Sequence, residues 1–239
     1  MRNPYDEFPE EYARSVRGPD EWGFSVHLEI IIPALLDAAG DVRGLNVLDA
    51  CCGDGYLTQL IAARGAHMTG IDISPRLIAA AREKEEQERR GIVYQVHDLT
   101  ERMPEYEHRF DLITCNLALD DVPDYRALIE NFADMLRRPG RLVLTFNNPY
   151  SAVMRELVSN YFDSGQAAIR RGMKAAGVPA VHYHRPLEDY MREFKRHGLL
   201  IRTLLDLRPS AEQLSLPSPR PRSYYFFPRL MLLELVAFQ

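Results

Sequence analysis

The chain has 239 residues, of which 46% are hydrophobic and 26% charged, with a formal net charge of −5. This composition excludes a disordered chain and provides enough apolar residues for the core of one α/β domain. A small negative charge gives no general attraction to a phosphate backbone, so nucleic acid is not expected as a partner.

No targeting or membrane segment is expected. The longest aliphatic run, residues 30–36, contains Pro33 and is far shorter than the roughly 20 residues of a span. The amino terminus lacks the apolar segment of a signal peptide. Cys51, Cys52 and Cys115 fit neither a disulfide framework nor a structural zinc site. We therefore expect a cytoplasmic protein without a membrane span or a bound metal.

Predicted strands and helices alternate through the first two thirds of the chain. Apolar residues at helical spacing predict a helix over 25–39, and Ser74-Pro75 predicts a helix start. Short apolar runs predict strands at 46–50, 68–73, 92–96, 111–116 and 141–146. A helix with Leu128, Phe132, Met135 and Leu136 on one face is expected to end at Pro139-Gly140. This alternation predicts a parallel sheet covered on both faces.

The last part of the chain follows a different pattern. A predicted helix at 187–196 precedes a strand near 199–205, and the last strand, about 229–238, follows without a clear helix. Such a connection predicts an antiparallel hairpin at the end of the sheet. Segments 148–184 and 207–228 are long for connections, which is typical of lids and binding loops.

The first predicted strand is followed by a loop with two glycines, Gly53 and Gly55. Glycine allows a sharp turn and a close approach of ligand to backbone, at the sheet edge where ligands bind. A dinucleotide fingerprint would need a third glycine where Thr58 stands, and Asp49 and Asp54 would repel a pyrophosphate. These charges favour a ligand with a positive pole, such as the sulfonium of S-adenosylmethionine. A nicotinamide oxidoreductase is the least favoured reading.

Acidic residues also end the next two predicted strands. Asp72 lies roughly 20 residues after the glycine loop, where a carboxylate can accept hydrogen bonds from both ribose hydroxyls. Asp98 can accept from an adenine amino group, and Ile73 and Leu99 offer apolar surfaces to the ring. Together these strand ends predict a nucleoside pocket.

With these motifs the chain resembles the class I S-adenosylmethionine-dependent methyltransferases. Residues 48–55 look like the glycine-rich first motif of that family, 70–74 like its ribose-binding motif, 110–116 like its fourth-strand motif and 136–142 like the stretch that enters strand five. The resemblance implies a doubly wound, Rossmann-like, seven-stranded and mostly parallel sheet with one antiparallel strand near the C-terminus. Cys51 stands where the family often has a glycine, and we expect it to be a small packing residue.

The resemblance and the strand ends together imply S-adenosylmethionine as the cofactor. The expected cofactor residues are Asp49, Cys51, Gly53, Gly55, Asp72, Ile73, Asp98, Leu99, Asn116 and Leu117. One domain is expected, made of a helical lid (1–40), a cofactor-binding core (41–147), a substrate or lid insertion (148–184) and a C-terminal helix with a strand hairpin (185–239).

Candidate catalytic residues lie in loops above the same edge. Methyl transfer depends mainly on positioning, and a base is needed only where the acceptor must lose a proton. Asp121 stands where many relatives carry a histidine; either it or Asp120 is a candidate base or a contact for a cationic substrate, and a helix cap is the alternative. His182 and His184 would share one side of an extended segment, with plain loop residues ahead of Pro186 as the alternative.

Aromatic residues gather in the extra segments. Those expected to line an acceptor pocket or a lid are Tyr5, Phe8, Tyr12, Trp22, Phe24, Tyr150, Tyr161, Phe162 and Tyr224 to Phe227. For the last four, entry into the final strand is the alternative. A sparse basic stretch, Arg202 to Arg208 with Arg220 and Arg222, gives little support for RNA.

The leading hypothesis is a methyltransferase that acts on an oxygen or nitrogen of a small-molecule metabolite, as a monomer or homodimer. Three alternatives remain open. They are a non-catalytic partner subunit that retains the cofactor pocket, an RNA- or tRNA-modifying enzyme, and an enzyme of the same fold that does not transfer a methyl group.

Overall fold

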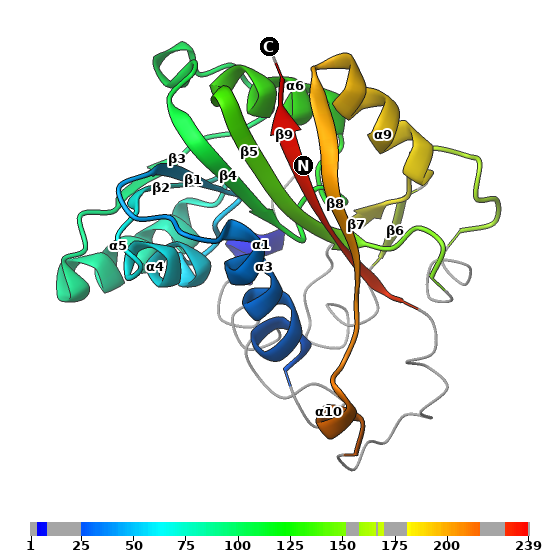
Figure 1. Cartoon of the computed structure of the whole chain (residues 1–239), viewed down its shortest axis with the longest axis horizontal. Helices are drawn as coiled ribbons and strands as arrows, with labels where there is room; N and C mark the ends of the chain where they lie inside the picture. The colour runs from blue at the N-terminus through cyan, green and yellow to red at the C-terminus, as the bar shows by residue number, and fades with distance from the viewer. Residues whose placement is uncertain are drawn as a thin grey trace.

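Buried apolar segments that alternate with amphipathic helices form a seven-stranded sheet (Figure 1). The computed structural model describes residues 4–8, 25–151, 158–165, 167–169, 181–215 and 228–238. The strand order is β3-β2-β1-β4-β5-β9-β8. β9 is antiparallel to both of its neighbours and the other pairs are parallel, so one strand is reversed. The predicted fold class is confirmed.

The sheet consists of β1 (Asn46–Ala50), β2 (His67–Asp72), β3 (Val93–Val96), β4 (Phe110–Asn116), β5 (Leu136–Asn147), β8 (Leu199–Leu207) and β9 (Leu230–Ala237). The helices are α1 (Pro4–Glu7), α3 (Ile32–Ala39), α4 (Tyr56–Ala62), α5 (Pro75–Glu88), α6 (Tyr125–Met135), α9 (Leu187–Arg196) and α10 (Ala211–Ser215), with turns η1 (His27–Ile31) and η2 (Pro104–Tyr106). A separate antiparallel pair joins β6 (Ala167–Ile169) to β7 (Val181–Tyr183).

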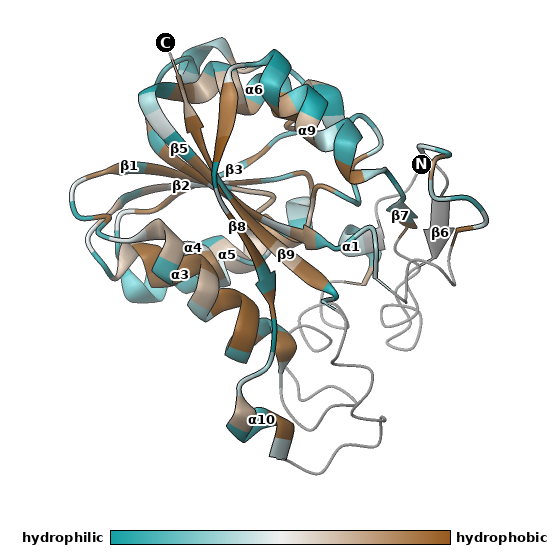
Figure 2. Ribbon diagram, turned by 45° about the vertical axis from the view of Figure 1, so that its right-hand side comes forward, coloured by the Kyte–Doolittle hydropathy of each residue, from teal (hydrophilic) through white to brown (hydrophobic). Residues whose placement is uncertain are grey.

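Helices cover both faces of the sheet, as the alternating pattern predicts. Figure 2 shows α6 and α9 on one side of the sheet and α3, α4 and α5 on the other. Phe132 of α6 and Phe194 of α9 belong to one buried cluster, and Leu35 of α3 and Ile61 of α4 belong to a second. None of the helices in the described part of the chain is long and apolar enough to cross a membrane.

Two predicted boundaries need correction. The helix expected to continue through Leu136 ends at Met135, because Leu136 pairs with Phe110 and begins β5. The pairing of β4 with β5 then shifts in register before Arg141, so Pro139 lies where no ladder bond to β4 is needed. The connection between β8 and β9 contains the short helix α10, although the hairpin is antiparallel as predicted.

The parallel order brings the loops after β1, β2, β3 and β4 to one edge of the sheet. We call this the carboxyl edge. Because the predicted ligand residues follow these strands directly, the topology decides whether they meet.

Candidate active site

The loop between β1 and α4 turns sharply at the carboxyl edge. Cys51, Gly53 and Gly55 all have a positive φ, of 57°, 56° and 76°. A Cβ atom at Gly55 would lie 2.3 Å from the hydroxyl oxygen of Tyr94. Position 55 therefore needs glycine for its backbone conformation and for its lack of a side chain.

Asp72 joins this loop to the end of β2. Its Oδ2 accepts a hydrogen bond from the Gly53 N–H at 2.8 Å, and its Oδ1 accepts one from the Ser74 N–H at 2.9 Å. The side chain is only 8% exposed, and burial raises its pKa. The glycine loop and the acid therefore lie together, as two adjacent parallel strands should place them.

Asp49 near the end of β1 and Asp54 in the glycine loop are both engaged by other side chains. Asp49 accepts hydrogen bonds from the hydroxyls of Thr58 at 2.6 Å and Thr114 at 2.9 Å, and burial raises its pKa to about 6. Asp54 forms an ion pair with Lys84 at 2.6 Å. The negative charge expected here from the sequence is therefore reduced by the protein's own groups. In the sequence, Thr58 and Lys84 were the residues that could have indicated partners for Asp49 and Asp54.

The ends of β2 and β3 present one apolar and one acidic group. Ile73 is 50% exposed, which is unusual for an isoleucine next to a buried strand. Oδ1 of Asp98 accepts bonds from the N–H and hydroxyl of Thr100, at 2.9 and 2.8 Å. Leu99 is buried in the core and packs behind the edge.

β4 ends in a bent segment that is held by β5. Oδ1 of Asn116 accepts a hydrogen bond from the Thr145 hydroxyl at 2.7 Å. Leu117 has a φ of 53°, and its N–H donates to the Thr145 carbonyl at 3.0 Å. These bonds fix the start of the loop that leads to the candidate catalytic acids.

Asp120 lies at the centre of a buried polar cluster. Its Oδ2 accepts from both the N–H and the Nδ2 of Asn147, at 2.9 and 2.7 Å, and its Oδ1 accepts from the Tyr190 hydroxyl at 3.3 Å. Nδ1 of His182 lies 3.8 Å from Oδ2. Two of the predicted candidates, Asp120 and His182, are therefore brought together from distant parts of the chain.

Asp121 points to a different partner. The Tyr5 hydroxyl of α1 donates a hydrogen bond to its carboxylate. The neighbouring Asp6 accepts bonds from the Ser74 hydroxyl at 2.9 Å and the Arg76 N–H at 3.0 Å. Helix α1 therefore connects the loop after β4 to the start of α5.

His184 is fully buried but separate from Asp120. Its Nε2 lies 2.7 Å from the Tyr161 carbonyl oxygen, and its ring meets that of Tyr161 edge-on at 5.4 Å. Tyr150 stacks on Tyr161 at 4.9 Å. Tyr150, Tyr161 and His184 thus form one aromatic cluster in the insertion.

Arg185 is a site residue that the sequence analysis missed. Its buried guanidinium donates to the carbonyls of Leu119, Val122 and Pro123, at 3.2, 2.7 and 2.9 Å, and lies over the Tyr125 ring. It therefore fixes the loop after β4 to the segment that directly follows the insertion. No pattern in the neighbouring sequence predicts this role of Arg185. For Tyr190 a signal did exist, because a tyrosine on the buried face of a predicted helix needs a polar partner for its hydroxyl.

Several predicted residues lie outside the part of the chain that the structure describes. These are Tyr12, Trp22, Phe24, Arg220, Arg222 and Tyr224 to Phe227.

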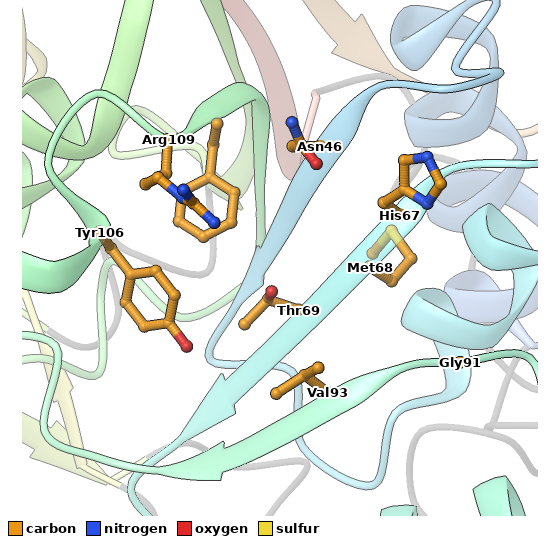
Figure 3. A pocket seen from close by; sticks show the side chains of 9 residues that line it. Asn46, His67, Met68, Thr69, Gly91, Val93, Tyr106 and Arg109 are labelled. Atoms are coloured by element: carbon orange, nitrogen blue, oxygen red, sulfur yellow. The ribbon is translucent and has the colours of Figure 1, made fainter.

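A surface hollow lies at the opposite end of the strands (Figure 3). It is lined by Asn46, His67, Met68, Thr69, Gly91, Val93, Tyr106, Arg109 and Phe110. Most of these residues begin β1, β2, β3 or β4, whereas ligands of such sheets bind at the carboxyl ends. Within the described ranges, no three histidine, cysteine or acidic side chains are grouped as a metal site requires.

Comparisons with known proteins agree with this geometry. A family model for a methyltransferase domain matches residues 47–140. The ubiquinone biosynthesis O-methyltransferase of Coxiella burnetii (strain Dugway 5J108-111) is 33% identical over 168 residues, which cover 62% of this chain and 71% of the relative. The enzyme of the same name from Xylella fastidiosa (strain 9a5c) is 31% identical over 171 residues, 66% of this chain and 70% of the relative.

Solved structures share the fold at lower identity. An S-adenosylmethionine-dependent methyltransferase from Mesorhizobium loti matches with a TM-score of 0.66 and 23% identity, covering 85% of this chain and 96% of the other. Geranyl diphosphate C-methyltransferase from Streptomyces coelicolor A3(2) matches with a TM-score of 0.65 and 16% identity, covering 87% of this chain and 79% of the other.

Proposed function

Because the chain belongs to the class I S-adenosylmethionine-dependent methyltransferases, we propose that it transfers the methyl group of S-adenosylmethionine to an oxygen of a small-molecule acceptor. Relatives at 31% and 33% identity that are named O-methyltransferases support an oxygen acceptor. The contact of 2.8 Å between Asp72 and the Gly53 N–H carries the proposal for the cofactor site.

The residues at the carboxyl edge suit a nucleoside with a sulfonium group, which supplies an electrophilic methyl. Each oxygen of Asp72 accepts one backbone hydrogen bond and has capacity for another from a ribose hydroxyl. Gly53 and Gly55 let the ligand approach the backbone, and the exposed Ile73 offers a surface to the adenine ring. Within the described part of the chain, no hydrogen bond engages Oδ2 of Asp98, so we assign that oxygen to the adenine amino group.

The remaining predicted residues act at the rim of the pocket or behind it. We assign Cys51, Asn116 and Leu117 to the side that faces the methionine part of the cofactor, because Cys51 directly follows β1, and Asn116 and Leu117 lie at the end of β4. Asp49 and Leu99 support the loop from behind, since both are buried and Asp49 is held by two threonines.

The N-terminal segment and the insertion complete the proposed domain. Helix α1 connects Asp121 to the start of α5, which supports a role for residues 1–40 as a lid over the core of 41–147. The insertion, 148–184, contributes His182 and His184, and we propose that it binds the acceptor. The segment 185–239 supplies β8 and β9, which complete the sheet at one end.

We also propose that the enzyme works in the cytoplasm on a free small molecule. Cys51, Cys52 and Cys115 are free thiols rather than disulfides, which supports a reducing compartment. Arg202 of the basic stretch forms an ion pair with Glu234, which leaves less charge for an RNA backbone.

The cofactor site is tested by combining a change in Asp72 with a change in the ligand. The probes are 5′-methylthioadenosine and its 2′,3′-dideoxy counterpart, with Asp72→Asn and Asp72→Ala compared with the wild type by calorimetry. We expect the Ala variant to lose roughly 2–4 kcal/mol of affinity for the hydroxylated probe. The wild type should discriminate against the dideoxy probe, whereas the variants should not.

Ser74→Ala is the matched control, since it removes a neighbouring hydroxyl but leaves the carboxylate. Equal discrimination in the wild type and the Asp72 variants would remove this residue from the ribose site.

A further inference from the structure

A buried acid and a buried histidine meet at the carboxyl edge, next to the proposed acceptor site. Asp120 is 2% exposed and His182 is 3% exposed. We infer that His182 is the general base that takes a proton from a hydroxyl acceptor. Asp120, rather than its neighbour Asp121, orients the imidazole and stabilises its protonated form. This inference rests on the proposed O-methyl transfer.

The carboxylate of Asp120 is held in one orientation. Two donors of Asn147 bind Oδ2 and the Tyr190 hydroxyl binds Oδ1, so the carboxylate cannot rotate away from His182 without breaking buried hydrogen bonds. Nδ1 is the ring nitrogen of His182 that faces Oδ2, at 3.8 Å. At this ion-pair distance a buried carboxylate stabilises the imidazolium, and with Nδ1 on the carboxylate side we assign proton uptake to Nε2.

Backbone contacts bring His182 to the correct edge. The N–H of Tyr183 donates to the Asp120 carbonyl at 2.7 Å, which joins β7 to the loop after β4. That loop begins at Asn116, the end of β4, and Asn147 ends β5. The pair therefore lies above two strands whose ends border the proposed methionine side of the cofactor pocket.

The other candidates have different roles. Asp121 is bound by Tyr5 of the lid, and Nε2 of His184 lies against the Tyr161 carbonyl. The guanidinium of Arg185 donates to the Leu119 and Val122 carbonyls, and its Nη1 also lies 3.5 Å from the Tyr190 hydroxyl that binds Asp120. Within the described residues, His182 is the imidazole that meets the Asp120 carboxylate.

Methyl transfer to the acceptor oxygen needs no reactant other than the acceptor and S-adenosylmethionine. Nε2 of His182 takes the proton of the acceptor hydroxyl while that oxygen forms a bond to the methyl carbon. The electron pair of the breaking carbon–sulfur bond stays on sulfur, which becomes a neutral thioether. The imidazolium, paired with Asp120, then releases its proton to water.

The first experiment needs no acceptor. The chain has seven histidines, and the ring signal of His182 can be identified in a ¹⁵N spectrum by its loss in His182→Gln. We expect Asp120→Asn to lower the midpoint of the His182 titration by about one pH unit, because the imidazolium loses its counter-charge. Asp121→Asn is the matched control and should leave the midpoint unchanged. An unchanged midpoint in Asp120→Asn, or a shift of equal size in Asp121→Asn, would overturn the pairing.

The second experiment tests proton removal, with 4-methylcatechol and the more acidic 4-nitrocatechol as probes. His182→Gln should lose about 100-fold or more in kcat/KM on the first probe and less than about 10-fold on the second, because an acidic hydroxyl ionises without help. A loss of the same size on both probes would overturn the role as base. Calorimetry of His182→Gln with S-adenosylhomocysteine should give wild-type affinity, which separates a failure of this inference from a failure of the proposed cofactor site.

Discussion

The two sides of the site are built in different ways. On the proposed cofactor side, Gly53 follows β1 and Asp72 ends β2, so parallel pairing of these two neighbouring strands brings them into contact. On the acceptor side, contacts join distant segments, such as Arg185 with the Leu119 carbonyl across 66 residues. The cofactor side is therefore a consequence of sheet topology, whereas the acceptor side depends on how the insertion packs.

Arg185 gives the largest expected effect and tests whether the two sides are separable. Arg185→Ala removes a buried guanidinium that donates to three loop carbonyls, of which that of Leu119 is fully buried, and we expect a loss of roughly 3–5 kcal/mol in the free energy of unfolding. Urea denaturation measures this loss. Calorimetry should still give cofactor affinity within about threefold of the wild type, since the cofactor side does not use this arginine.

The control for this change is Arg126→Ala. Arg126 lies over the same Tyr125 ring but its side chain is 64% exposed, so we expect a loss below about 0.5 kcal/mol. A collapse of cofactor affinity in Arg185→Ala would show that the two sides form one unit.

Gly55→Ala tests the cofactor side. The new Cβ would combine a φ of 76° with a contact of 2.3 Å to Tyr94, whose ring also lies against Gly70 and has little room to move. We expect about 2–4 kcal/mol of destabilisation in urea and a cofactor affinity too weak for calorimetry.

Gly44→Ala separates the two causes of this loss. Gly44 has a φ of 72°, but nothing lies within 4 Å of the position that an added methyl group would take, so only backbone strain of about 1 kcal/mol is expected. Equal losses in the two variants would mean that the Tyr94 ring yields at no cost.

The smallest expected effect is a pH dependence that originates at Asp49. Burial raises the pKa of this carboxyl from 3.8 to about 6. Between these values the folded state holds a proton that the unfolded chain has released, so the free energy of unfolding falls as pH rises through this window and then levels off. A shift of about two units corresponds to at most roughly 3 kcal/mol.

Asp49→Asn removes this titration. Urea denaturation at pH 4 to 7 should show the wild type losing about 1–3 kcal/mol relative to the variant as pH rises. Asp72, whose charge contributes to the raised pKa of Asp49, is retained in both proteins, so the difference reports the Asp49 titration together with its coupling to Asp72. A difference that does not change with pH would contradict the assignment.

Short-range patterns were sufficient to predict the sheet and to place the candidate cofactor residues at its carboxyl edge. Alternating apolar runs, the Ser74 cap and the glycine loop depend on neighbours in sequence, and parallel pairing then places Asp72 beside Gly53. The same patterns misplaced Leu136, whose strand pairing with Phe110 outweighs its helical spacing. They also did not pair Lys84 with Asp54, because these two residues lie 30 positions apart and meet only through packing of α5.

By itself the sequence determined the order along the chain of the strands of the main sheet, the fold class and the sheet edge at which we propose the cofactor site, because strand periodicity and turn chemistry are local properties of the chain. Only the tertiary structure decided which of two adjacent acids meets a histidine: Asp120 faces His182, while Asp121 binds Tyr5. Neighbouring side chains in a loop point in different directions, and packing between segments far apart in the sequence determines what each one contacts.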